Sequence, residues 1–193
     1  MKINCMVLAL LITFISATSS QALITINGIY SNYVNNKGFG AGTEFRISDT
    51  YSVRVLISKL EETTIKAAVF SFAGQNFGED TFKVSSYALE GQVFTNESLF
   101  GFRFGLAGFV DLLYGKDSSG NLIGLPANAY IGAFVNNKQD ILPFLQGYGE
   151  AGYLVRVVNG EKEFNSRIKP ASVDLGDIDK SGFYSRLGVS ISI

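Results

Sequence analysis

Short segments in which apolar residues alternate with small or polar residues recur along most of this chain. The clearest covers residues 182–193 and places its apolar side chains on one face. Phe183, Leu187, Val189, Ile191 and Ile193 make up that face, and Tyr184, Arg186, Gly188, Ser190 and Ser192 make up the other. Side chains of a β-strand point alternately to its two faces, so the pattern predicts a strand with one apolar and one polar surface.

Turn residues divide the rest of the chain into further segments of strand length. We expect eight strands, at 23–31, 39–48, 51–58, 82–94, 99–115, 127–135, 141–158 and 182–193. The short connections are then 49–50, 95–98 and 136–140, and the longer loops are 32–38, about 60–79, 116–126 and 159–181. Segment 64–72 has an irregular period and is interpreted as an excursion or an extension of its neighbours.

The number of strands follows from the way a barrel closes. Bacterial single-chain membrane barrels have an even number of antiparallel strands, with short turns on one side and longer loops on the other. Nine candidates therefore reduce to eight, or become ten if 64–72 spans and 99–115 divides near Gly108. The prediction is an all-β, antiparallel, up-and-down transmembrane β-barrel of eight strands, with ten as the alternative.

The first 22 residues have the features of an export signal. Lys2 is their only charge, an apolar run follows at 6–15, and Ser20 and Ala22 are small residues of the type that a signal peptidase reads. The apolar run is too short for a membrane-spanning helix. We therefore expect a cleaved signal peptide at 1–22, a barrel domain at 23–193, and localisation in the outer membrane.

Composition narrows the possible functions. The chain has no histidine, and its one cysteine, Cys5, lies inside the predicted signal, so His-based or Cys-based catalysis and His or Cys metal sites are excluded. The net charge is −1 with scattered charges, which argues against nucleic acid as a partner. We expect no enzyme activity, cofactor or metal, and only a remote acid-only site using Glu44 or Glu150 remains.

Six charged residues fall on the polar faces of the expected strands and are the candidate site. They are Glu44, Arg46, Arg54, Arg103, Glu150 and Arg186. The interior of an eight-stranded barrel is only wide enough to be filled by side chains, so these charges are expected to pair there. The network is interpreted either as a packed ionic plug or as a gate whose partners exchange to open a narrow path.

The signal, the alternating strands and the terminal strand together resemble the small outer-membrane β-barrel proteins of Gram-negative bacteria. The stretches 108–114, 129–133 and 149–153 are similar in rhythm to the YfaZ-like family. The chain departs from the usual barrel-closing signature, because Ile193 stands where an aromatic residue is expected. The resemblance implies outer-membrane lipid as a partner, and periplasmic chaperones and barrel-assembly machinery as partners during biogenesis.

Two functions from different classes remain. The leading hypothesis is a non-enzymatic integral outer-membrane protein, structural or surface-exposed, or a narrow porin-like pore with a charged plug. The alternative is a soluble periplasmic, lipocalin-like barrel that binds an apolar ligand. The two differ in which face of the strands is apolar, since a carrier would place its phenylalanine and leucine side chains inside. Oligomeric state, ligands and receptors are not indicated by the sequence.

Overall fold

The computed structural model describes residues 24–68, 71–72, 75–76, 79–116, 122–124, 127–160, 172–173 and 179–192. The predicted signal peptide at 1–22 lies outside these residues. Among the described residues there is no helix long and apolar enough to cross a membrane.

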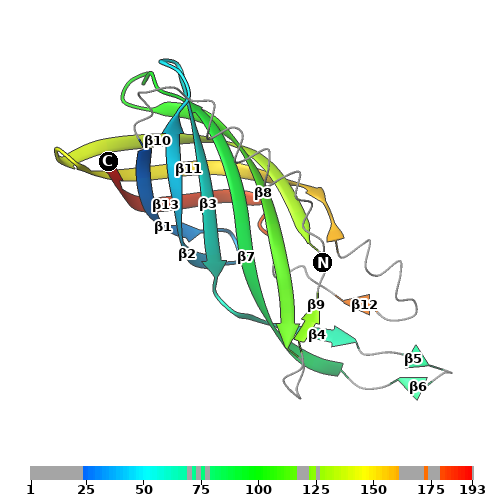
Figure 1. Ribbon diagram of the computed structural model, residues 1–193. Helices are drawn as coiled ribbons and strands as arrows, with labels where there is room; N and C mark the ends of the chain where they lie inside the picture. The colour runs from blue at the N-terminus through cyan, green and yellow to red at the C-terminus, as the bar shows by residue number, and fades with distance from the viewer. Residues whose placement is uncertain are drawn as a thin grey trace.

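Eight antiparallel strands close into a barrel (Figure 1). They are β1 (Ile24–Asn32), β2 (Lys37–Arg46), β3 (Tyr51–Leu60), β7 (Glu79–Thr95), β8 (Arg103–Lys116), β10 (Asn128–Leu142), β11 (Leu145–Val158) and β13 (Gly182–Ser192). Each strand pairs with the next in the chain, and β13 pairs with β1 over Thr25 to Asn32. This closure leaves no exposed edge around the ring of described strands, and it confirms the predicted eight-stranded, up-and-down fold.

Five short strands of the described chain lie outside the closed ring. They are β4 (Thr63–Ala68), β5 (Ser71–Phe72), β6 (Gln75–Asn76), β9 (Leu122–Gly124) and β12 (Ser172–Val173). β4 pairs with the beginning of β7, on the edge that β3 occupies further along, so it continues the line of β3. Residues 64–68 therefore extend the line of β3 and do not form a further spanning strand, and residues 71–72 pair with β6 in a separate two-stranded sheet, so the ten-stranded alternative is wrong. In Figure 1, β4, β5, β6 and β9 lie at the lower end of the barrel, opposite the short turns.

The third short turn lies further along the chain than the sequence pattern predicts. Residues 136–140 continue β10, and the chain reverses only at Pro143 and Phe144, where Leu142 pairs with Leu145. The polar side chains that suggest a turn belong to the end of the strand nearest the turn. Proline fixes its own φ near the value that a turn needs and cannot donate to a strand ladder, so the reversal falls there.

The turn between β7 and β8 also differs from the expectation. β8 begins at Arg103 rather than at residue 99, because Leu99 and Phe102 form an isolated bridge around Phe100 and Gly101. Both central residues have positive φ, 54° and 83°. Two successive left-handed residues close a tight hairpin and interrupt the extended backbone. The β2–β3 connection is likewise longer than predicted, at residues 47–50.

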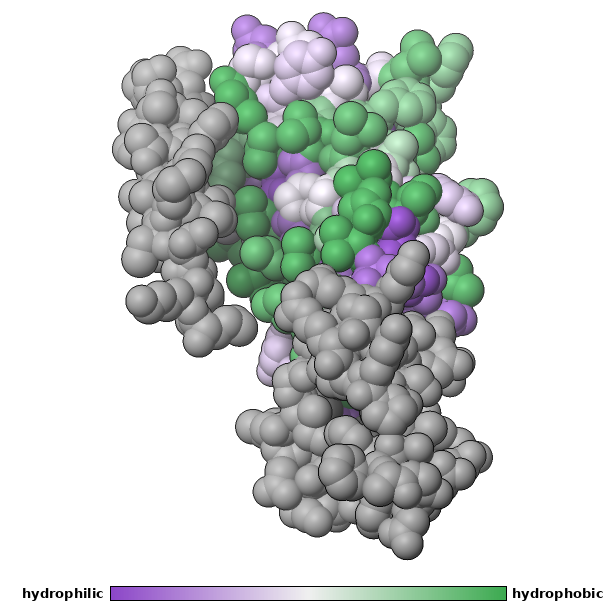
Figure 2. Space-filling model, turned by 90° about the vertical axis from the view of Figure 1, so that its right-hand side faces the viewer, coloured by the Kyte–Doolittle hydropathy of each residue, from purple (hydrophilic) through white to green (hydrophobic). Residues whose placement is uncertain are grey.

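The two faces of the barrel wall differ in polarity as the alternation predicts. Outward side chains are apolar and exposed, with Leu106 at 68% and Leu187 at 69% exposure. Figure 2 shows hydrophobic side chains gathered across the middle of one face, with hydrophilic side chains at its upper edge. Inward side chains are buried and include Arg54 and Arg186, at 0% and 2% exposure, packed among aromatic rings. A lipocalin-like carrier needs the opposite distribution, so this alternative is not supported.

Candidate functional site: the charged interior

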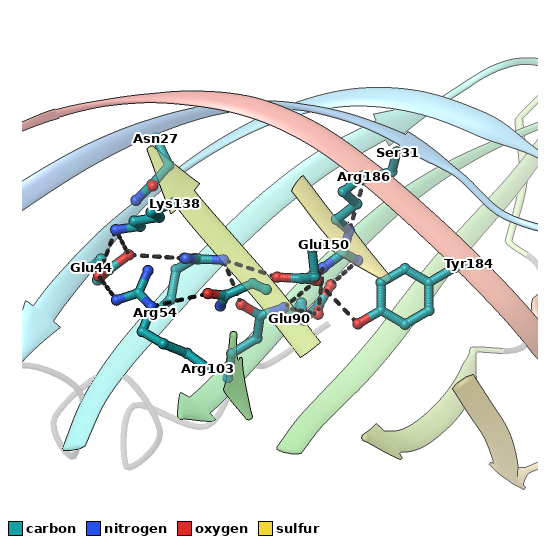
Figure 3. Close-up of polar contacts among 12 residues, drawn as sticks. Asn27, Ser31, Glu44, Arg54, Glu90, Arg103, Lys138, Glu150, Tyr184 and Arg186 are labelled. Atoms are coloured by element: carbon teal, nitrogen blue, oxygen red, sulfur yellow. Dashed lines mark hydrogen bonds and ion pairs between the residues drawn. The ribbon is translucent and has the colours of Figure 1, made fainter. Parts of the chain in front are cut away.

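The interior of the barrel holds a continuous network of charged side chains (Figure 3). Its members come from β2, β3, β7, β8, β10, β11 and β13, each from the inward face of its strand. Two buried arginines, Arg54 on β3 and Arg186 on β13, are its centres. The even period of the strands brings these distant positions together, because every second residue faces the interior.

Small residues on the same faces make room for the long side chains. A Cβ added at Gly42 would collide with the backbone carbonyl oxygen of Val55. A Cβ added at Gly105 would collide with the ring of Phe134. Close approach of the backbone is a common reason for glycine within a strand.

Arg54 uses all three of its guanidinium nitrogens. Nε and Nη2 donate to Glu44 Oε2 at 3.2 and 3.0 Å, and Nη1 donates to Glu150 Oε2 and to Gln92 Oε1 at 3.0 Å each. Its guanidinium also lies 4.8 Å from the ring centres of Phe94 and Tyr148. The side chain is thus both paired and stacked, which offsets the cost of removing its charge from water.

Arg186 makes a second set of contacts on the side of the longer loops. Nη1 donates to Glu90 Oε1 at 2.8 Å, Nη2 donates to Glu90 Oε2, and Nη1 also reaches Glu150 Oε1 at 2.9 Å. Nε donates to the Ser31 hydroxyl at 3.0 Å, and Nη2 donates to the Tyr33 hydroxyl at 2.7 Å. Tyr33 lies between β1 and β2, and burial raises the pKa of its phenol, with Arg186 acting in the opposite direction.

Glu150 links the two arginines. Its Oε2 accepts from Arg54, and its Oε1 accepts from Arg186, from the Tyr184 hydroxyl at 3.1 Å and from Gln92 Nε2 at 2.9 Å. The carboxylate is buried, and each of these hydrogen bonds is charge-assisted because the acceptor is ionised. One carboxylate therefore joins the β3 half of the network to the β13 half.

At the end nearest the short turns, Glu44 collects three cations. Besides Arg54, the Lys138 ammonium donates to both of its oxygens at 2.8 Å, and Arg103 Nη1 lies 3.8 Å from Oε1. Arg103 Nε donates to Asn136 Oδ1 at 3.0 Å. This part of the network thus contains more positive than negative groups.

Five of the six candidate residues meet in this network, and Arg46 does not. Arg46 lies at the end of β2, and its Nη2 pairs with Asp49 Oδ1 at 2.9 Å in the turn that follows. Both side chains are largely exposed. Arg46 is on the polar face of its strand, but it lies at the rim of the barrel, where its long side chain turns toward solvent.

The sequence interpretation misses several members of the network. Glu90 and Gln92 lie on β7, where the alternation is weak, and Lys138 lies in the segment predicted to be a turn. Alternate residues of a strand share a face, so Lys138 is expected to face inward because Asn136, two residues before it, does. In the same way, counting every second residue from Arg103 along its strand leads to Asp111, which is fully buried.

Asp111 belongs to a second, separate cluster near the longer loops. Its carboxylate pairs with the Lys180 ammonium and accepts from the Ser86 hydroxyl, and all three side chains are buried. Lys180 lies two residues before β13, and its ammonium is 5.7 Å from the centre of the Phe109 ring. Burial lowers the pKa of Lys180, and the Asp111 charge acts in the opposite direction. The contact ties the segment before β13 to β7 and β8 across the interior.

The chemistry open to these groups is limited. Ser86 lies beside a carboxylate and an ammonium, an arrangement that can activate a hydroxyl, but the cluster is closed to solvent and no substrate can reach it in this conformation. Within the described residues, no group of three or more His, Cys, Asp or Glu side chains is placed to hold a metal ion. The contacts are those of packing and charge pairing.

Comparison with solved structures identifies the fold. The chain is similar to a major outer membrane protein from Thermus thermophilus, with a TM-score of 0.52 and 14% identity, over 90% of this chain and 100% of that one. At this identity the likeness concerns the fold alone: both chains are closed antiparallel β-barrels.

Two further structures were matched at lower similarity. CarO2 of Acinetobacter baumannii gives a TM-score of 0.39 and 9% identity, over 90% of this chain and 100% of that chain. The de novo designed TMB2.3 gives 0.36 and 10%, over 89% and 94%. No protein-family model and no curated protein matches the chain, so the YfaZ-like resemblance stays a prediction.

Proposed function

We propose that this chain is a non-enzymatic, integral outer-membrane β-barrel with a sealed interior. The observation that carries the proposal is the distribution of side chains across the wall, with exposed apolar groups outside and buried ion pairs inside. An outward band of this kind in water would be a large apolar surface, whereas in hydrocarbon it is the stable arrangement. Outer-membrane lipid is then the main partner, with periplasmic chaperones and the barrel-assembly machinery acting during biogenesis.

The interior supports a plug rather than a path. Arg54 and Arg186 are both buried inside the barrel, and Glu150 connects them through direct hydrogen bonds of 3.0 and 2.9 Å. Opening a path requires at least one buried ion pair to separate without a replacement, which costs about 3–5 kcal/mol. The protein is accordingly proposed to act as a structural or surface-exposed element, and a narrow pore that opens by exchange of partners is the rival.

The alternative carrier function needs an apolar cavity inside the barrel. The buried interior positions instead include Glu44, Glu90 and Glu150 together with their cationic partners. A ligand without polar groups would have to replace these charges and leave them unpaired. The side-chain distribution therefore favours a membrane barrel over a periplasmic carrier.

Cell fractionation combined with gel migration tests the proposal. We expect the chain in the outer-membrane fraction, with a faster-migrating band when the sample is not heated in detergent. Recovery in the soluble periplasm would contradict the membrane assignment.

Planar-bilayer recordings then test the plug. We expect membranes containing the purified protein to show no regular conductance steps. Reproducible steps from the unmodified protein would replace the plug with the narrow pore.

A further inference from the structure

A polar cavity opens at the end of the barrel where the short turns lie. Its volume is about 700 Å³, and its lining includes Glu44, Arg46, Asn96, Arg103 and Lys138. Arg103 and Lys138 keep 14% and 10% of their side-chain surface exposed, so both are reachable from the cavity while most of each side chain is enclosed.

Two enclosed cations of the cavity wall share one carboxylate. Lys138 and Arg103 both lie within ion-pair distance of Glu44, which also pairs with Arg54, a fully buried residue that does not line the cavity. Arg54 has a second carboxylate partner in Glu150, but among the described residues Glu44 is the only carboxylate within ion-pair distance of Arg103. Arg103 is enclosed, and its one carboxylate partner is 3.8 Å away and is shared with other cations. The charge of Arg103 is therefore incompletely compensated.

Two hydrogen-bond donors at the same place are also unused. Arg103 Nη2 and Asn136 Nδ2 are buried and have no partner within the described part of the chain. The two side chains touch, since Arg103 Nε donates to Asn136 Oδ1 at 3.0 Å. Buried donors without partners are costly, so an acceptor is expected at this point.

Negative groups on the rim do not cancel this field. Asp49 is paired with Arg46, and its side chain is fully exposed, so solvent screens its charge. Glu97 also lines the cavity and is exposed. The enclosed part of the wall is therefore cationic and rich in donors, while the lining carboxylates other than Glu44 stand in solvent.

We propose that this cavity binds a phosphate-type oxyanion, either free or as a phosphate ester, against Arg103. The planar guanidinium presents donors that match two oxygens of such a group, and Lys138 supplies a second positive charge. Water alone would satisfy the donors but would leave the charge of Arg103 poorly compensated. The site faces the side of the membrane on which the short turns lie, and its occupation does not require the interior plug to open.

Calorimetric titration of the folded protein in a non-ionic maltoside detergent tests the proposal. Inorganic phosphate is one probe, and glycerophosphoethanolamine, which has the phosphodiester of a lipid headgroup without acyl chains, is the other. We expect saturable binding of one equivalent by at least one probe. Tighter binding of phosphate indicates a free anion, and tighter binding of the ester indicates a headgroup.

Variants locate the site. Arg103→Gln is expected to weaken binding by about tenfold, as for the loss of one strong charge-assisted contact. Arg156→Gln is the matched control, because it removes the same charge from a partly exposed side chain that does not line the cavity, and it should leave binding nearly unchanged. Arg103→Lys keeps the charge but loses the planar fork, so it should give intermediate binding, and it replaces the glutamine variant if that variant does not fold. Absence of binding by both probes, or an equal loss in the Arg156 and Arg103 variants, would overturn the proposal.

Discussion

Replacing Arg186 by methionine should be one of the most damaging single substitutions in the barrel interior. The change removes the two-pronged contact with Glu90 and one contact with Glu150. Glu150 keeps Arg54, whereas Glu90 keeps only the amide of Gln92 among the described residues. A buried carboxylate without its cation destabilises a fold by about 3–5 kcal/mol, so we expect Arg186→Met to lower the free energy of unfolding by that amount.

The size of the loss comes from the stranded carboxylate rather than from the missing arginine contacts. Adding Glu90→Leu to Arg186→Met should therefore restore at least half of the lost stability, because an apolar pair of similar volume can replace a buried ion pair with little net change. Arg46→Met is the control, since Arg46 and its partner Asp49 are largely exposed, and it should have little effect.

Urea unfolding in lipid vesicles supplies the measurement. The chain has no tryptophan and nine tyrosines, so strand content by circular dichroism and the fraction of the unheated, fast-migrating band are the suitable signals. If Arg186→Met stays within about 1 kcal/mol of the unmodified protein, or if the double variant is less stable than the single one, the reasoning on the buried network is wrong.

Three further predictions concern other parts of the barrel. Lys180→Met should destabilise the protein by about 3 kcal/mol in the same urea assay, and adding Asp111→Leu should recover most of this; no loss in the single variant would contradict a stabilising role for this ion pair. Gly42→Ala should lower the unfolding free energy by about 1–3 kcal/mol, because the new Cβ meets backbone, whereas Gly108→Ala has open space around its Cβ and should be neutral; equal effects would refute the packing argument. Tyr33 has a raised pKa in the folded state, so its contribution is fully present below pH of about 10 and is lost as pH rises toward the folded pKa; Tyr33→Phe should flatten the alkaline decrease of unfolding free energy, and an unchanged slope would count against it.

The alternation of side chains makes most of the fold predictable. In β13, Leu187 and Arg186 fall on opposite faces in the sequence pattern and lie outside and inside the barrel in the structure. The period is two, so a single well-marked strand assigns every residue of that strand to a face. The even strand number then follows from the closure rule, and the described residues of segment 64–72, namely 64–68 and 71–72, lie outside the ring as predicted.

The predicted turn near the β10–β11 hairpin is wrong because polarity alone does not mark a turn. Asn136 and Lys138 point inward, where polar residues are normal, and the strand continues past them to Leu142. Alternation is visible in the sequence only where one face of the strand is apolar and the other is polar, as in the membrane region. Where β10 approaches the turn, both faces are polar and the pattern disappears.

The sequence does not show which charged residues pair with each other inside the barrel. Arg54 bonds Glu150 across 96 residues, and Lys180 bonds Asp111 across 69. Face assignment shows that these groups point inward, but stagger between strands decides which of them meet. Glu90 is missed for a local reason, because its neighbours on β7 include Ala88 and Gly91, which give little contrast between faces.

Accessibility of spin labels tests the central claim most directly, namely that the apolar outer face contacts lipid. In a Cys5→Ser background, single cysteines at Leu106 and Leu187 are labelled in protein reconstituted in vesicles, with a cysteine at Asp49 as the turn control. We expect the labels at 106 and 187 to collide readily with oxygen and rarely with a water-soluble nickel chelate, and the label at 49 to show the reverse. Nickel accessibility at positions 106 and 187 equal to that at position 49 would contradict the account.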